Sequence, residues 1–173
     1  GFSTAFIDLL VKKKVADKIA DSANNPYLYR YTERFLFKHG LKPLSSIKDM
    51  IGSKSTKGMH LLAKFMPIEE SCGVWSDGES IKAIEAYPSA CKHSICVNEL
   101  LTPFLEQPAE FNQKTKKATR TPLTEWQNAD EFDALICPLL GWCQIKQPEL
   151  IVQPDKLASP QEGWIFVPVD SLS

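Results

Sequence analysis

Apolar positions recur at helical spacing in several parts of the chain. Near the N-terminus they follow a period of about 3.6 residues, which predicts a helix over 3–22. The same spacing predicts helices over 27–39 and 43–65, with Gly40 in the position that ends the first of these two. Further helices are expected over 88–96, 98–106 and 125–143, with a polar loop over 107–124 between the last two.

The clearest strand signal is the alternation of residues 81–87. Ala83 and Glu85 point to one side of such a strand, and Ile84 points to the other. Only one other strand, over 164–167, is predicted, so the backbone groups of 81–87 lack enough partners. The sheet is therefore expected to be incomplete in this chain.

The composition is that of a soluble globular domain. Hydrophobic residues make up 43% of the 173 residues and charged residues 24%, which excludes disordered, collagen-like and coiled-coil chains. The length suits one domain over 1–173. No apolar run approaches the ~20 residues that span a bilayer, so no membrane partner is expected. No secretory signal is visible at the N-terminus either.

Cysteine content and charge distribution add to this picture. An odd number of cysteines, five, favours a reducing compartment and predicts a cytoplasmic protein, while the lack of a Cys-x-x-Cys motif disfavours a zinc site. Residues 1–60 carry 11 Lys and Arg against 5 Asp and Glu, and residues 61–173 carry 9 against 16. This asymmetry is typical of a basic side that faces a polyanion, or of two halves that attract each other.

Acidic residues are the most informative candidates for chemistry. Asp130 and Asp133 stand three apart on one helix face, and Asp133 borders an apolar stripe. Carboxylates in such a place bind a cation such as Mg²⁺ or Mn²⁺, and Glu85 could supply a third ligand. The alternative is a solvated first helical turn in which Asp130 is favoured by the helix dipole.

Basic residues in two places could contact phosphates. One group lies in the polar loop over 107–124, and its alternative is an ordinary solvated loop. The other lies in the helix expected over 27–39, where Glu33 offers the alternative of an ion-paired helix surface. The candidates are Arg30, Arg34, Lys116, Lys117 and Arg120.

Six short segments, in this order, resemble the Domain of Unknown Function 429 family, whose members are regarded as ribonuclease H-like nucleases. The pattern Asp130-x-x-Asp133-Ala134 also resembles the last catalytic helix of Holliday-junction resolvases. The six segments are Tyr29-Arg30-Tyr31-Thr32-Glu33-Arg34-Phe35, Pro43-Leu44-Ser45, Ile51-Gly52, Glu85-Ala86-Tyr87-Pro88-Ser89-Ala90, Asp133-Ala134-Leu135-Ile136-Cys137 and Glu162-Gly163-Trp164-Ile165-Phe166-Val167-Pro168.

The resemblance implies a three-layer α/β/α domain in which acids from the first strand, a middle strand and a late helix bind divalent metal. Glu85, Asp130 and Asp133 are then the expected catalytic residues and ligands of Mg²⁺ or Mn²⁺. Members of the family begin with a strand that carries an aspartate, and this strand would precede Gly1. The chain is thus expected to be the helix-rich C-terminal portion of such a domain, without its N-terminal strands and inactive alone.

Three hypotheses about function follow. The first is a metal-dependent nuclease that hydrolyses phosphodiesters. The second is a non-catalytic module on the same fold that binds nucleic acid or protein. The third, a small-molecule phosphotransferase, lacks the glycine-rich turn that would cradle a phosphate, and no Ser-His-acid trio supports a nucleophilic hydrolase. An exposed sheet edge predicts a homo-oligomer.

Overall fold

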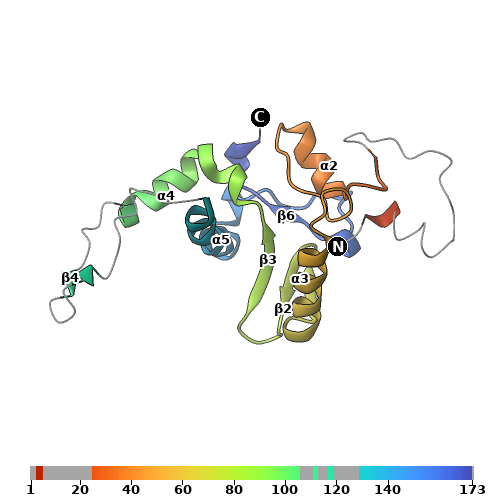
Figure 1. Cartoon of the computed structure of the whole chain (residues 1–173), viewed down its shortest axis with the longest axis horizontal. Helices are drawn as coiled ribbons and strands as arrows, with labels where there is room; N and C mark the ends of the chain where they lie inside the picture. Colours follow the sequence, from red (N-terminus) through yellow and green to blue (C-terminus); the bar gives the residue numbers. More distant parts are fainter. Residues whose placement is uncertain (1–2, 6–24, 106–110, 113–116, 119–128, 173) are drawn as a thin grey trace.

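A computed structural model describes residues 3–5, 25–105, 111–112, 117–118 and 129–172 (Figure 1). Apart from 3–5, the helix expected over 3–22 lies outside these residues. The loop expected over 107–124 is described only at 111–112 and 117–118.

The described residues form helices and a small mixed sheet, an α/β arrangement. The α-helices are α2 (Tyr31–Lys38), α3 (Gly52–Phe65), α4 (Ile95–Leu105) and α5 (Ala129–Lys146). The strands are β1 (Ile68–Ser71), β2 (Val74–Ser76), β3 (Lys82–Ala86), β4 (Phe111–Asn112), β5 (Lys117–Ala118) and β6 (Ile165–Phe166). Short 3-10 helices are η1 (Pro88–His93), η2 (Pro148–Leu150), η3 (Pro160–Glu162) and η4 (Val169–Ser171). None of these helices is long and apolar enough to cross a membrane.

Four strands make the main sheet, in the order β1-β2-β3-β6. The first three run antiparallel to their neighbours, whereas β3 and β6 are parallel, with Glu85 opposite Ile165. A parallel pair needs a long crossover, and here α4 and α5 lie between the two strands in sequence. β4 and β5 pair separately.

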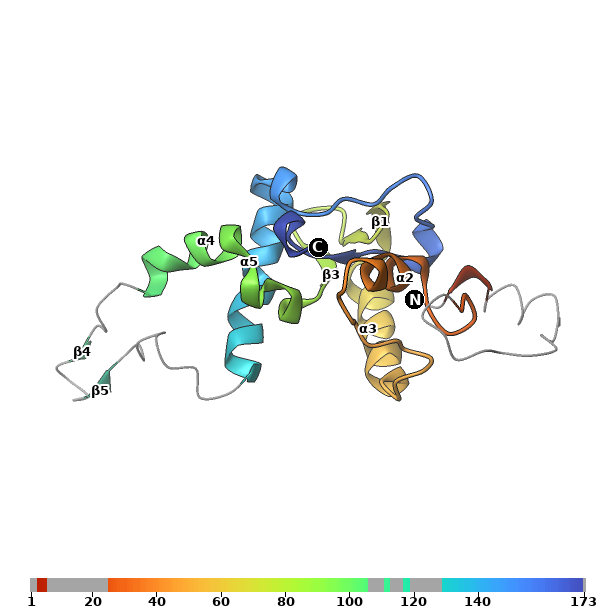
Figure 2. The same ribbon diagram turned by 90° about the horizontal axis from the view of Figure 1, so that it is seen from above.

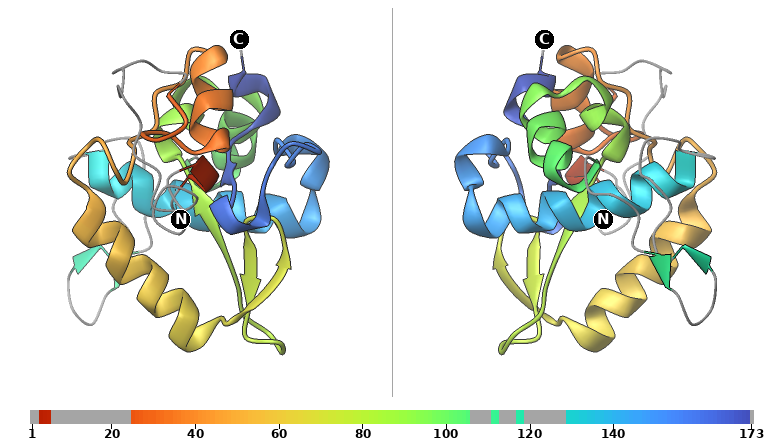
Figure 3. Two further views of the ribbon diagram at one scale, coloured as in Figure 1. Left: turned by 90° about the vertical axis from the view of Figure 1, so that its right-hand side faces the viewer. Right: turned by 90° about the vertical axis from the view of Figure 1, so that its left-hand side faces the viewer.

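The core lies between α5 and one face of the sheet. Figures 1 and 2 show α5 and α3 on opposite sides of β3, and Figure 3 shows α5 running across the strands. On the α5 side, side chains of the helix pack with apolar residues of the strands and of the C-terminal segment. The largest buried members of this cluster are Ile136, Leu140, Trp164 and Phe166, and Val74 and Ile84 join them from the strands. By contrast, α3 has no buried residue.

The hairpin of β1 and β2 corrects the expectation of a single partner for the strand at 81–87. All four residues of β1 are exposed, so this strand carries no alternating pattern that a sequence analysis could detect. Its partner β2 is only three residues long. Cys72 and Gly73 form the turn at the tip of this hairpin.

Helix boundaries also differ from the expected ones, most at the start of α3 and around Ser94. The predicted helix over 43–65 begins only at Gly52, because Ser45 and Asp49 hold a turn: the Asp49 carboxylate accepts from the Ser45 amide at 2.6 Å. Around Ser94 the chain changes from η1 to α4. The Ser94 hydroxyl accepts from the amide of Val97, which caps the new helix.

Gly73 is held in a conformation that a larger residue cannot adopt freely. Its φ is +78°, and a Cβ atom there would lie 2.7 Å from the backbone nitrogen of Trp164. We expect Gly73→Ala to lower the free energy of unfolding by about 2–4 kcal/mol, through left-handed strain and overpacking. The control is Gly58→Ala in α3, where a Cβ would meet nothing within 4 Å. Equal urea midpoints for the two variants would contradict this expectation.

Candidate functional site

Arg30 joins three segments that are far apart in the sequence. It lies directly before α2, and its side chain is 4% exposed. The two terminal guanidinium nitrogens donate to the two carboxylate oxygens of Glu85 on β3, each at 2.7 Å. Nε donates to Glu33 at 2.9 Å, and Nη1 also donates to the carbonyl oxygen of Glu162 at 3.2 Å. The guanidinium therefore fixes α2, β3 and η3 to one another.

The two carboxylates around Arg30 have different surroundings. The Glu33 side chain is only 1% exposed, whereas that of Glu85 is 39% exposed. Burial raises the pKa of Glu33 above its ordinary value, against the lowering effect of Arg30. Burial alone would lower the pKa of Arg30, but the hydrogen bonds and charges of Glu85 and Glu33 raise it above its ordinary value. Arg30 thus stays charged and keeps both acids near it.

The local sequence places these groups. Glu33 occupies the third position of α2, and its carboxylate accepts from the Arg30 amide at 2.9 Å, which satisfies an open N–H of the helix start. The Glu162 carboxylate accepts from the next amide, that of Tyr31, at 2.5 Å. An acid from its own helix and one from the C-terminal segment therefore cap α2.

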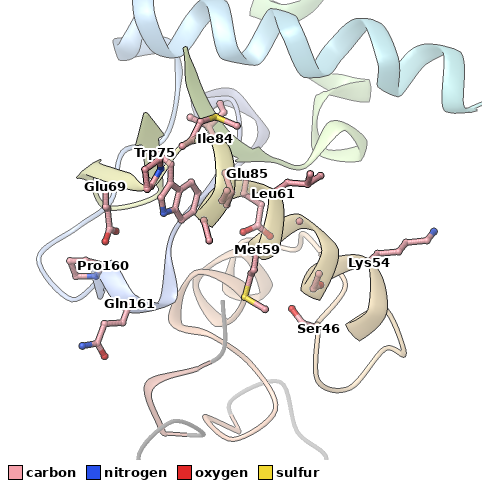
Figure 4. Close-up of a pocket in the computed structure, with 16 residues that line it drawn as sticks. Ser46, Lys54, Met59, Leu61, Glu69, Trp75, Ile84, Glu85, Pro160 and Gln161 are labelled. Carbon is pink, nitrogen blue, oxygen red and sulfur yellow. The ribbon is translucent and has the colours of Figure 1, made fainter. Parts of the chain in front are cut away.

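A cleft of about 760 Å³ opens between α3 and the sheet (Figure 4). Glu69 is paired with Trp75, and Trp75 with Ala83, so these residues and Glu85 share the sheet face that points away from α5. Met59 and Leu62 line the cleft from α3. The cleft thus has an aromatic and apolar lining, with carboxylates of Glu69 and Glu85 at its sheet side.

The candidate acids on α5 lie on the other side of the sheet. Asp130 is exposed and Asp133 is half-buried, both near the start of the helix. Because Ile84 and Ala86 face α5, Glu85 between them points to the cleft instead. Within the part of the chain that is described, no three His, Cys, Asp or Glu side chains are grouped so as to hold a metal ion. The ligand roles of Glu85, Asp130 and Asp133 stay a prediction.

No protein-family model, curated protein or solved structure matches the chain. The resemblance of its segments to a nuclease family therefore stays an expectation.

The basic candidates occupy different environments. Arg30 is buried and bound to carboxylates, and Arg34 is half-buried, with its guanidinium 5.9 Å from the centre of the Tyr31 ring. Lys117 begins β5. Lys116 and Arg120 lie outside the described residues. In the structure Arg30 therefore binds the carboxylates of Glu33 and Glu85. Phosphate binding by the basic residues of 107–124 stays a prediction.

Glu69 and Trp75 are residues of the cleft that the sequence analysis does not single out. Both belong to the β1–β2 hairpin, and an exposed strand beside a three-residue strand gives no periodic signal. The turn pair Cys72-Gly73 between two short stretches is the one local signal that could have indicated the hairpin.

Proposed function

We propose that the chain forms part of a ribonuclease H-like, metal-dependent phosphodiesterase that acts on nucleic acid. One observation carries this proposal. Three of the segments that resemble the nuclease family, 29–35, 85–90 and 162–168, meet at Arg30, which hydrogen-bonds to Glu85 and to the carbonyl of Glu162. Contact between these segments is what a shared functional unit requires, and local sequence does not impose it.

In this proposal the acids divide into two groups. Asp130 and Asp133 are accessible near the start of α5 and hold a Mg²⁺ or Mn²⁺ ion. A bound ion supplies activation of water and stabilisation of the leaving oxygen. Glu85 stands apart from this ion, because it faces the cleft on the other side of the sheet and Arg30 donates to both of its carboxylate oxygens. Lys116, Lys117 and Arg120 contact phosphates.

A second candidate is a non-catalytic module that binds nucleic acid or protein. The observation in its favour is that Arg30 already engages both oxygens of Glu85 at 2.7 Å. A metal ion would have to displace a buried guanidinium to use this carboxylate. This candidate predicts binding without cleavage.

The test measures binding and cleavage together. Labelled single- and double-stranded DNA and RNA are incubated with the 173-residue chain, and in parallel with the full-length natural protein, with Mg²⁺ or with a chelator. We expect binding that weakens with salt, and cleavage by the full-length protein that the chelator abolishes.

Replacing Lys116 and Lys117 by glutamine should weaken binding and flatten the salt slope by about 0.7–0.9 for each phosphate that the variant no longer neutralises.

Lys92→Gln is the matched control, since Lys92 is exposed and far from these positions in sequence. Salt-dependent binding with no cleavage by the full-length protein would favour the non-catalytic module. Absence of binding to DNA, RNA and nucleotides at every salt concentration would contradict the nuclease and leave only a module that binds protein.

A further inference from the structure

β1 is an open edge of the main sheet. It pairs only with β2 in the order β1-β2-β3-β6, and all four of its residues are exposed. Ile68, its first residue, is 48% exposed. No strand in the described ranges pairs with the outer side of β1. Its outward N–H and C=O groups are therefore placed to bind an added strand.

The cleft lies on one face of this edge. Glu69 of β1 and Trp75 of β2 stand opposite each other and both line the cleft (Figure 4). Side chains alternate between the two faces of a sheet, so a strand added beside β1 directs every second side chain toward Glu69 and Trp75. The cleft, at about 760 Å³, has room for such side chains.

The charges along β1 indicate which kind of strand can bind at this edge. β1 carries two adjacent acids, and Glu70 is paired with Lys82 on the neighbouring part of the sheet. Glu69 points to the cleft and forms no salt bridge with another described residue. Because opposite residues of an antiparallel pair share a face, a second copy centred on this edge would place Glu69 against Glu69 or Glu70 against Glu70, an unfavourable pair of like charges. A strand with lysine or arginine side chains would instead place positive charges beside the carboxylates of Glu69 and Glu70.

We propose that β1 binds an extended basic peptide as an added strand, with a lysine or arginine side chain in the cleft between Glu69 and Trp75. Backbone hydrogen bonds to the edge supply affinity, and the cleft supplies specificity. The cation lies near a carboxylate and an indole face, both of which attract it. This interaction surface is independent of the phosphodiesterase proposal, because it uses neither Asp133 nor the basic residues of 107–124.

The test uses three short synthetic peptides: alternating arginine and valine, alternating glutamate and valine, and the arginine peptide with N-methylated valines. Titration calorimetry gives the affinity, and amide chemical shifts of the chain locate the site. We expect the arginine peptide alone to bind, with shifts in β1 and in the Trp75 indole. Glu69→Lys should weaken binding by about tenfold or more, whereas Glu79→Lys, in an exposed turn, should change it by less than about twofold.

Several outcomes would overturn the proposal. They are equal binding of the glutamate peptide, full binding of the N-methylated peptide, and unchanged affinity of a folded Glu69→Lys variant. Shifts of the same β1 amides caused by self-association of the chain, or by an oligonucleotide that competes with the arginine peptide, would assign the edge to another occupant. Both Glu69 and Glu79 are exposed, so thermal unfolding should confirm that the two variants fold like the original chain.

Discussion

Replacing Arg30 by methionine is expected to lower the free energy of unfolding by about 3–5 kcal/mol, as removal of one partner of a buried ion pair does. The loss comes mainly from Glu33, which is 1% exposed and would keep a buried charge without a counterion. Glu85 contributes less, since water screens its 39% exposed side chain. Urea unfolding measures the change.

Two further variants make this result specific. Lys92→Met removes an exposed positive charge and should change stability by less than about 0.5 kcal/mol. Adding Glu33→Gln to Arg30→Met removes the unpaired buried charge and should restore part of the lost free energy of unfolding. If Arg30→Met is no more destabilising than Lys92→Met, Arg30 does not hold the three segments together.

Replacing Asp133 by asparagine is the second large effect. The amide keeps the size of the side chain and removes the charge of a metal ligand, so Mg²⁺-dependent cleavage by the full-length natural protein should fall by about 100-fold or more. Nucleic-acid binding should hold or tighten, because repulsion between the acid and phosphate is relieved. Single-turnover cleavage and binding are measured on the same substrate.

Glu99→Gln is the matched control, an exposed acid on α4 that has no role in the proposed chemistry. Its cleavage rate should equal that of the original protein. If Asp133→Asn cleaves as fast as this control, Asp133 is not a metal ligand.

Strongly periodic segments could be predicted from the sequence. The alternation over 81–87 predicts β3, and the apolar stripe over 125–143 predicts most of α5, whose Ile136 and Leu140 are buried. The hairpin could not be predicted in the same way. β1 buries nothing, and β2, which pairs with both β1 and β3, is only three residues long. Similarly, side-chain bonds around Ser45, which delay the start of α3, leave no periodic signal.

The site could be predicted only in part. Arg30 and Glu85 stand out in the sequence, but as separate candidates for phosphate and metal binding. Their bidentate contact joins residues 55 apart, and no local pattern indicates a pairing over that separation. The alternative of an ion-paired helix surface for Arg30 and Glu33 is right about the pair, since the two residues bond. Both are buried, however, and Arg30 also bonds to Glu85 and to the carbonyl of Glu162.

The position of β6 has a consequence for synthesis on the ribosome. Residues 164–167 lie near the C-terminal end of the described chain, yet each is at most 2% exposed and packs against elements made much earlier. Until these residues leave the exit tunnel, Val74 and Leu140 lack the partners that cover them in the finished core. The apolar faces of β2 and α5 therefore stay uncovered in the nascent chain until residues 164–167 have been made, and the core closes only after that point.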